Sequence, residues 1–406
     1  DGDDAAAQVF GDDGDENIIK CGSYTGNGSA DGPTIDCGFE PQWLLIKNTS
    51  DGGNWVLMDA MRGMPVGDEA TVLLPNANGA ESSYANLWGV DLQATGFKVN
   101  VSQIQINESG GTMIYIAIRR PMKTPEAGTE VFDVDQASNS VAPKFRAPFP
   151  VDMAWYRLNV SSTESSIVAD RLRGEKELNF DTTFSEGGLS AGKFDYMNGW
   201  NSLTGANSAS YSWMLKRATG FFDMVAYTGT GGTSTQAHNL GVVPELMIFK
   251  RRNSSQAWNT YVASSVLASA GPTKFLELND TASIATDNNF INGAPTSSLI
   301  NTGSNTNQNG DTYIAYLFAT LEGVSKLGSY TGTGNNLNVD CGFSAGARFI
   351  LIKRTDAINP WYYWDSERGI VAGNDPYLLI NSSAAEVTNT DYVDPLNAGF
   401  TVTSSA

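Results

Sequence analysis

The sequence is poor in basic residues, histidine and cysteine, and each shortage limits what the protein can do. Its 406 residues include 25 Lys and Arg, 44 Asp and Glu, one His and three Cys, for a net charge of −19. So acidic a surface repels phosphate, which argues against nucleic-acid binding and against docking on anionic membranes. One His and three scattered Cys are too few for a zinc site. The longest apolar runs are strand-length, so no membrane insertion is predicted; a membrane helix needs roughly 20 residues.

The three cysteines, at 21, 37 and 341, are too few for a disulfide framework. The sequence leaves a Cys21–Cys37 pair across a hairpin open, although Cys341 recurs at the Cys37 position without a nearby partner. Segment 1–16 carries Asp and Gly residues that suit Ca²⁺, but their spacing does not match the EF-hand loop. We interpret it as a solvated acidic segment, and we predict no metal and no cofactor.

Glycine, serine, threonine and asparagine are frequent, with 42 Gly alone. No long stretch places apolar residues at helical spacing. Short apolar or alternating runs, separated by turn residues, recur instead along the chain. This pattern predicts an all-β protein.

Self-comparison shows that the same blocks recur in the same order. A Tyr-Thr-Gly-x-Gly turn stands at residues 24–28, 227–231 and 330–334. A Gly then precedes an apolar run that ends in a base, and in three copies a Trp follows eight residues after the base. The bases are Lys47, Arg157, Lys250 and Lys353, and the tryptophans are Trp55, Trp258 and Trp361. We interpret the tryptophans as packing residues, with sugar stacking as the alternative.

An Asp-x-x-Arg-Gly motif is the most repeated charged feature. It stands at Asp59 and Arg62, at Asp170 and Arg173, and at Asp365 and Arg368. The remaining copy has Val262 and Ser265 in these places. We interpret the motif as a structural ion pair that fixes a turn, with the Gly supplying a positive φ. The alternative is a sugar or anion site that uses the bidentate donors of Arg.

The blocks repeat about every 100 residues, which is the size of an independent β-sandwich and too long for a solenoid repeat. The predicted fold is therefore a tandem array of jelly-roll-like β-sandwich modules. After the acidic segment 1–16, the modules span residues 17–121, 122–219, 220–322 and 323–406.

Modules 2 and 4 depart from the pattern. Module 2 is the most diverged, and its irregular opening, residues 122–145, is interpreted as linker-like. Module 4 lacks the closing block that stands at 111–118 and 311–318 in modules 1 and 3. Because a sheet without its closing strand has an unpaired edge, we expect the native chain to continue or another chain to supply the strand.

Two further features are candidates for function. Trp361, Tyr362, Tyr363 and Trp364 form the densest aromatic cluster. Because alternate strand residues point to opposite faces, two of the four are expected to face solvent and to be available for glycan contact. His238 is a weak catalytic candidate, since no repeated partner accompanies it. No P-loop, Rossmann fingerprint or nucleophile elbow stands in the required context, so the protein is predicted not to be an enzyme.

Together these blocks resemble the repeat modules of tail-fibre-like virion proteins of bacteriophages, with those of marine and cyanobacterial phages most similar. The resemblance covers nearly the whole chain and is weakest in module 2. It implies a virion structural protein of the phage tail that contributes to host attachment. The implied partners are other phage tail proteins, a host surface glycan or receptor, and further copies of the chain in a homo-oligomer, with a trimer as the analogous state.

Two alternatives remain open from the sequence. One is a polysaccharide-degrading tailspike, which needs a pair of carboxylates in a groove. The other is a capsid or head-fibre decoration protein, which the sequence does not separate from a tail protein.

Overall fold

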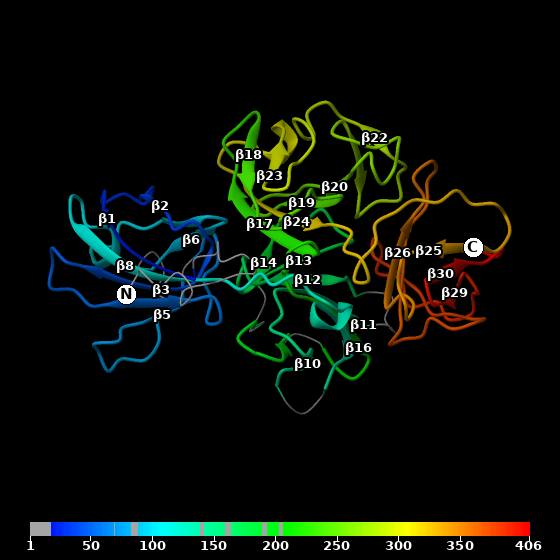
Figure 1. Ribbon diagram of the computed structural model, residues 1–406, viewed down its shortest axis with the longest axis horizontal. Coiled ribbons are helices and arrows are strands. Elements are labelled where there is room, and N and C mark those ends of the chain that lie inside the picture. Colours follow the sequence, from blue (N-terminus) through cyan, green and yellow to red (C-terminus); the bar gives the residue numbers. More distant parts are fainter. Residues whose placement is uncertain are drawn as a thin grey trace, which may run out of the picture. The chain divides into compact units, whose positions relative to one another are not determined.

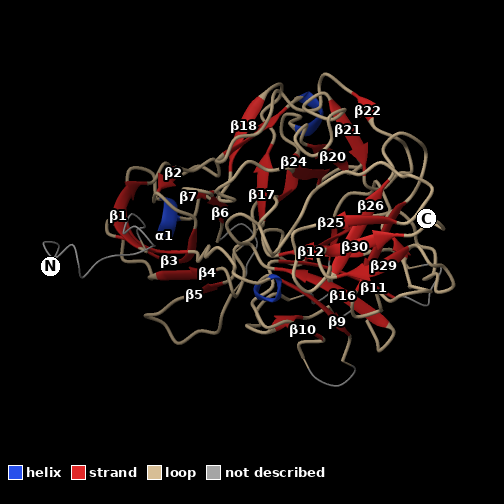
Figure 2. Ribbon diagram, turned by 45° about the vertical axis from the view of Figure 1, so that its right-hand side comes forward, coloured by secondary structure: helices blue, strands red, loops and turns tan. Residues whose placement is uncertain are grey.

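The computed structural model describes residues 18–68, 70–82, 88–138, 142–158, 164–188, 193–202 and 206–406. Within them the regular structure is almost entirely antiparallel β-sheet (Figure 2). The helical segments described are α1 (Ile104–Asn107) and the 3-10 turns η2 (Gly128–Glu130) and η3 (Ser304–Thr306). None of the described helices is long and apolar enough to cross a membrane. The predicted all-β class is confirmed.

The chain forms two compact units. Unit 1 holds residues 1–121 with 171–174, and unit 2 holds residues 122–170 with 175–406. The predicted acidic segment 1–16 lies outside the described residues. The described strands of module 1 therefore belong to unit 1, and those of modules 2, 3 and 4 belong to unit 2.

Module 1 contains a five-stranded main sheet and a small three-stranded sheet (Figure 1). The main sheet runs in the order β1 (Ile19–Thr25), β8 (Thr112–Arg119), β3 (Pro41–Asn48), β4 (Val56–Asp59) and β5 (Val72–Leu73). The small sheet runs in the order β2 (Thr34–Asp36), β7 (Gly96–Val99) and β6 (Val90–Gln93).

The two sheets of module 1 pack face to face. Leu44 and Ile46 of β3 and Tyr115 of β8 are buried on the side that meets the small sheet. Phe97 of β7 contacts the Tyr115 ring at 5.7 Å between centroids. The alternation of buried and less buried residues along β3 and β8 follows from the two-residue period of a strand. We call this covered side the inner face of the main sheet, and the opposite side the outer face.

Modules 2 and 3 have main sheets of six strands and small sheets of two. The main sheet of module 2 is β14 (Gly187–Gly188), β13 (Lys176–Asn179), β12 (Ile167–Asp170), β11 (Met153–Leu158), β16 (Ser210–Leu215) and β9 (Phe132–Gln136), and its small sheet is β10 (Phe145–Arg146) and β15 (Gly199–Trp200). The main sheet of module 3 is β17 (Phe222–Thr228), β24 (Thr312–Phe318), β19 (Leu246–Arg251), β20 (Asn259–Val262), β21 (Lys274–Glu277) and β22 (Ala285–Thr286), and its small sheet is β18 (Ser234–Ala237) and β23 (Leu299–Thr302).

Module 4 has two three-stranded sheets. Its main sheet is β26 (Phe349–Lys353), β27 (Trp361–Asp365) and β28 (Leu378–Leu379), and its small sheet is β25 (Leu337–Asp340), β30 (Gly399–Val402) and β29 (Val393–Leu396). Within residues 206–406, β26 pairs only with β27, so the edge at which β3, β11 and β19 pair with a closing strand is open in module 4.

The main sheets of modules 1, 2 and 3 share one strand order. The opening strand, which is β1 in module 1 and β17 in module 3, pairs with the closing strand (β8, β16 or β24). The closing strand pairs with the strand that carries the repeated base. The strand that ends at the Asp-motif position (β4, β12 or β20) and a further strand follow. In module 2 the opening position is taken by β9, which lies with η2 in the stretch predicted to be a linker. That interpretation is wrong: five residues of the stretch pair with β16 because its polar sequence still alternates with Phe132 and Val134.

The backbone requires glycine at two of the repeated positions. The Gly before each base-ended strand has a positive φ of 77° at Gly38 and at Gly241, which favours glycine. In the Tyr-Thr-Gly-x-Gly turn, a Cβ on Gly26 would lie 2.3 Å from the Glu108 carbonyl oxygen. These repeats in the sequence are therefore requirements of the fold.

Candidate functional site

The outer faces of the main sheets in modules 2, 3 and 4 cover one another. Trp213 of module 2 contacts Tyr363 of module 4 at 5.1 Å between ring centroids. Phe180, just after β13 of module 2, contacts Trp258 of module 3 at 4.9 Å. The same positions that could have been an exposed binding surface therefore form contacts between modules.

Module 3 donates a set of hydrogen bonds to module 2. The indole Nε1 of Trp258 donates to the carbonyl of Asn179 at 2.9 Å, and Lys250 Nζ donates to the carbonyl of Thr183 at 2.8 Å. The Tyr316 hydroxyl donates to the Asp170 carboxylate at 2.7 Å. The repeated Trp, the repeated base and the closing strand all take part in this contact.

Module 4 repeats this contact on module 3. Trp361 Nε1 donates to the Glu277 carbonyl at 3.0 Å, and Lys353 Nζ donates to the Thr281 carbonyl at 2.7 Å. Strand register makes Glu277 the counterpart of Asn179, because Asn259 and Ile167 face them across their sheets. The two interfaces therefore use equivalent donors and an equivalent acceptor strand.

Module 2 completes the cycle on module 4. Arg157, which stands where the other modules have Lys, donates through Nη1 to the Leu379 carbonyl at 2.8 Å and through Nη2 to the Ala384 carbonyl. Trp213 Nε1, at the register position of Tyr316, donates to the Asp365 carboxylate at 3.0 Å. Three successive modules thus form a closed, head-to-tail arrangement within one chain, which we call the inter-module ring.

Two of the three basic residues of the ring are held away from water, and Lys353 is partly buried. Lys250 and Arg157 are almost fully buried. Burial, followed by the charge of Arg251, lowers the pKa of Lys250 to about 8, and burial lowers the pKa of Lys353 to about 8. Each lysine also donates to a carbonyl six residues further along its own chain, at Gln256 and at Asn359. These bases are bound to backbone carbonyls and are not presented to an anionic ligand.

The repeated Asp and Arg residues form the predicted ion pair in modules 1 and 4. Arg62 Nε lies 2.7 Å from Asp59 Oδ2, and Arg368 Nε lies 2.6 Å from Asp365 Oδ2. The Gly that follows each Arg has a φ of 124° at Gly63. Asp170 accepts the Tyr316 hydroxyl, as described above, and Arg173 is buried. The geometry fits a pair that fixes a turn.

Arg368 also contacts a second carboxylate and two aromatic rings. Besides Asp365, it contacts Glu386 at 2.8 Å. Its guanidinium carbon lies 5.5 Å from the Trp213 ring centroid and 5.3 Å from that of Tyr363. Glu386 belongs to an Ala-Glu pair that the sequence repeats at residues 80–81 and 385–386, and the counterpart Glu81 of module 1 lies 4.0 Å from Arg62.

The aromatic cluster at 361–364 is largely inside the protein. Trp361, Tyr363 and Trp364 are buried, and Tyr362 is partly exposed. The expectation that two of the four face solvent is wrong, because β27 is covered on both faces. Its inner face meets Val393 and Phe400 of the small sheet, and its outer face lies in the inter-module ring. Tyr362 remains as the ring of the cluster that a glycan could reach.

The histidine and the cysteines have structural surroundings. His238 is buried; its Nδ1 accepts from the Leu240 N–H at 3.2 Å, so Nε2 carries the proton toward the Thr296 carbonyl. Burial lowers the pKa of His238, more than the nearby Asp223 raises it. Cys21 is exposed and Cys37 is buried, and both are free thiols, so they do not form the disulfide that the sequence left open.

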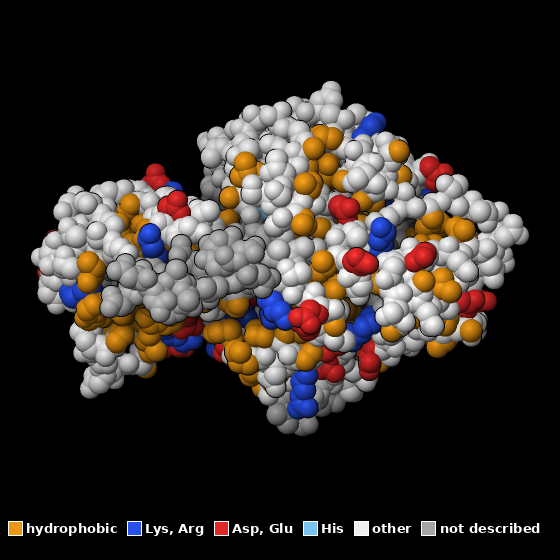
Figure 3. All heavy atoms as spheres, viewed as in Figure 1, with side chains coloured by type: hydrophobic (Ala, Val, Ile, Leu, Met, Phe, Trp, Pro, Cys, Tyr) orange, Lys and Arg blue, Asp and Glu red, His pale blue; other side chains and the backbone are white. Residues whose placement is uncertain are grey.

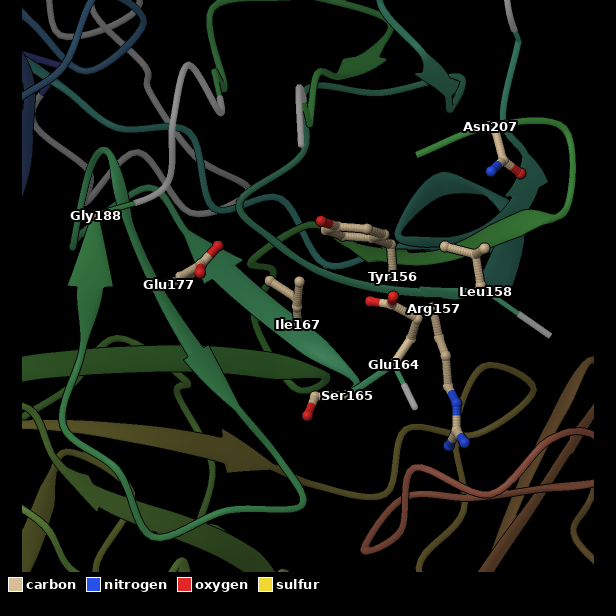
Figure 4. A pocket seen from close by; sticks show the side chains of 9 residues that line it. All are labelled: Tyr156, Arg157, Leu158, Glu164, Ser165, Ile167, Glu177, Gly188 and Asn207. Carbon is tan, nitrogen blue, oxygen red and sulfur yellow. The ribbon is translucent and has the colours of Figure 1, made fainter. Parts of the chain in front are cut away.

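A cleft of about 480 Å³ in module 2 is the candidate ligand site. It is lined by β11 and by neighbouring residues that include Glu164, Glu177 and Asn207. Figure 4 shows the two carboxyl groups on either side of Ile167, while the Arg157 side chain points away toward its carbonyl partners. The cleft therefore offers carboxylates and a partly apolar floor. The repeating blocks gave no signal for it, because it lies where module 2 departs from them.

No group of three or more His, Cys, Asp or Glu residues suited to a metal ion occurs in the part of the chain that the structure describes.

The fold and these contacts define an all-β protein whose modules are joined by a repeated interface. The chain belongs to the family described as a domain of unknown function (DUF7483), which it matches over residues 7–121 and 202–406. The match leaves out residues 122–201, the part of module 2 that includes most of the cleft lining. No curated protein matches the chain.

Proposed function

We propose that the protein is a structural component of a bacteriophage virion, a tail fibre or tail appendage that contributes to host attachment. The observation that best supports this proposal is that the repeated residues make contacts within the chain. The bases, the indoles and the Asp–Arg pairs bind other parts of the same chain, as a scaffold requires. A scaffold of this kind carries load and displays loops without any chemistry of its own.

The proposed binding partners follow from the resemblance and from where the modules differ. The partners are other tail proteins for assembly and a host glycan or receptor for attachment. We place recognition at the module 2 cleft, because most of its lining lies in the part of module 2 that the family match leaves out. The partly exposed Tyr362 is a second contact for a sugar ring.

Two measurements on virions test this proposal. Gold-labelled antibody against the protein should decorate the tail in electron micrographs, and the antibody should slow adsorption to host cells. Label on the head would place the protein among capsid or head-fibre decoration proteins. Virions without label, or adsorption unchanged by saturating antibody, would contradict the attachment role.

The second candidate function is cleavage of a polysaccharide. The observation that favours it is the pair Glu164 and Glu177 in one cleft, since glycoside hydrolysis needs two carboxylates. Incubating host polysaccharide with the protein and measuring new reducing ends separates the two functions. Release that disappears in Glu177→Gln would establish the enzyme; no release from a polysaccharide that the protein binds would leave the attachment role.

A further inference from the structure

Module 1 has an apolar outer face whose side chains are exposed or partly exposed in the part of the chain that the structure describes. Its residues come from five neighbouring strands of the main sheet. They are Ile19, Leu45, Leu57, Leu73, Ile114, Ile116 and Ile118. All seven are at least partly exposed. In Figure 3 hydrophobic side chains gather on the lower part of unit 1, around the place where Figure 1 draws β5.

The matching positions of module 3 are buried. Strand register pairs Leu45 with Ile116 in module 1 and Ile248 with Tyr316 in module 3, which fixes the correspondence. By this register Ile114, 38% exposed, matches Ile314, which is 0% exposed. Ile19, 59% exposed, matches Phe222, also 0% exposed. The same face is therefore an interface in one module and solvent-facing in the other.

Module 1 also keeps the polar residues that join the ring. Lys47 Nζ donates to the Gly53 carbonyl at 2.7 Å, six residues along, as Lys250 and Lys353 do with their own loops. Its other bond goes to the Asp51 carbonyl in the same loop, where the two other lysines reach a neighbouring module. Trp55 is half-buried, although Trp258 and Trp361 are buried in the ring.

We propose that three copies of this chain assemble through module 1, each placing its outer face on the next as modules 2, 3 and 4 do within one chain. The occupant of the face is thus a second copy of the same module. Head-to-tail contacts close into a ring when the rotation between neighbours divides a full turn. The intramolecular ring closes with three modules, so three identical copies of module 1 close in the same way.

Position 116 of module 1 lacks the hydrogen-bond donor that modules 2 and 3 have in the ring. Ile116 stands where Trp213 and Tyr316 donate a hydrogen bond to an Asp of the neighbour. A ring of module 1 is therefore held by apolar contact at this point, and Asp59 keeps its own Arg62 as partner. Substitution of Ile116 by a charged residue would place an unpaired charge in that contact, which is costly.

The test is the mass of the full 406-residue chain in solution, measured by light scattering during gel filtration. The wild type should have three times the 43.4 kDa of the chain, and Ile116→Glu should have the mass of one chain with an unchanged circular dichroism spectrum. The matched control is Ile358→Glu, at an exposed isoleucine of module 4, which should remain a trimer. A monomeric or dimeric wild type, or a trimer that Ile116→Glu leaves intact, would overturn the proposal.

Cys21 provides a second measurement on the same samples. It lies opposite Ile116 on the adjacent strand and is an exposed thiol in the single chain, whereas Cys37 is buried. A maleimide should modify Cys21 slowly in the wild type and at least tenfold faster in Ile116→Glu. Equal rates in the two proteins would show that the face is open in both and would contradict the trimer.

Discussion

The buried ion pair of Asp365 and Arg368 allows a quantitative test of the inter-module ring. Asp365 Oδ1 accepts the backbone N–H groups of Glu367 and Arg368, and Oδ2 accepts Arg368 Nε and Trp213 Nε1. In Asp365→Asn the turn keeps its Oδ1 acceptor, but an amide N–H₂ replaces the oxygen that meets two donors. The substitution therefore removes the charge and two side-chain hydrogen bonds while preserving shape.

The expected cost follows from burial. Side chains of the pair are 0% and 2% exposed, and hydrogen bonds to a charged group contribute about 1.5–3 kcal/mol each. Breaking a buried pair costs about 3–5 kcal/mol, because the partner charge stays behind. We therefore expect Asp365→Asn to lower the opening free energy of β27 by about 3–5 kcal/mol.

Asp59→Asn in module 1 is the matched control. The same motif there is 19% and 18% exposed, so a cost of about 1 kcal/mol is expected. Both substitutions are made in Ile116→Glu, so that the outer face of module 1 stays open. Hydrogen exchange with mass spectrometry reports the opening free energies of β27 and β4 separately. Equal losses at the two sites would refute the claim that the ring determines the difference.

Three further predictions concern ring closure, pH and the cleft. Arg157→Met should lower the stability of unit 2 in urea by about 2–3 kcal/mol, because two buried carbonyls lose their donor; Arg354→Met, at an exposed pair with Asp356, should change nothing measurable. The single imidazole signal in NMR should titrate below pH 6.5, since burial lowers the pKa of His238. The unfolded chain then binds the proton more readily, so this residue's contribution to stability is lost as pH falls below about 6.5, and His238→Gln should remove that part of the acid sensitivity; a midpoint at or above 6.5 would contradict the burial argument. If the cleft binds host polysaccharide, Glu177→Gln should weaken binding at least fivefold, with Glu367→Gln outside the cleft as the control.

Local sequence was sufficient for the strands and turns that repeat between the modules, but not for β9, which was interpreted as part of a linker. The runs that end in Lys47 and Lys250 form β3 and β19, and the repeated Gly and Asp–Arg residues have the positive φ and the ion pairs that such turns require. An asparagine that recurs after an apolar run, at positions 76, 179, 279 and 381, is displaced by two residues in module 2. The backbone N–H groups of Trp55, Trp258 and Trp361 donate to the side-chain oxygens of Asn76, Asn279 and Asn381, whereas strand register makes Asp181, and not Asn179, their counterpart in module 2.

The ring could not be predicted from the sequence, because the contacts that form it are distant along the chain. Arg157 and its acceptor Leu379 are 222 residues apart. The base-ended runs of modules 1 and 3 are nearly alike, yet Leu45 is partly exposed and Ile248 is buried, since burial depends on whether another module covers the face. The same reason explains why two of the four aromatic side chains at 361–364 were expected at the surface.

The most direct test of the inter-module ring is the exchange of tryptophan indole protons, measured by NMR in Ile116→Glu. Trp258 and Trp361 donate to carbonyls of the preceding module and Trp213 donates to Asp365, so these three Nε1–H groups should exchange slowly. Trp55 stands at the same sequence register but is only half-buried, so its indole proton should exchange faster than these three. If Trp258 and Trp361 exchanged as fast as Trp55, modules 2, 3 and 4 would not form the ring.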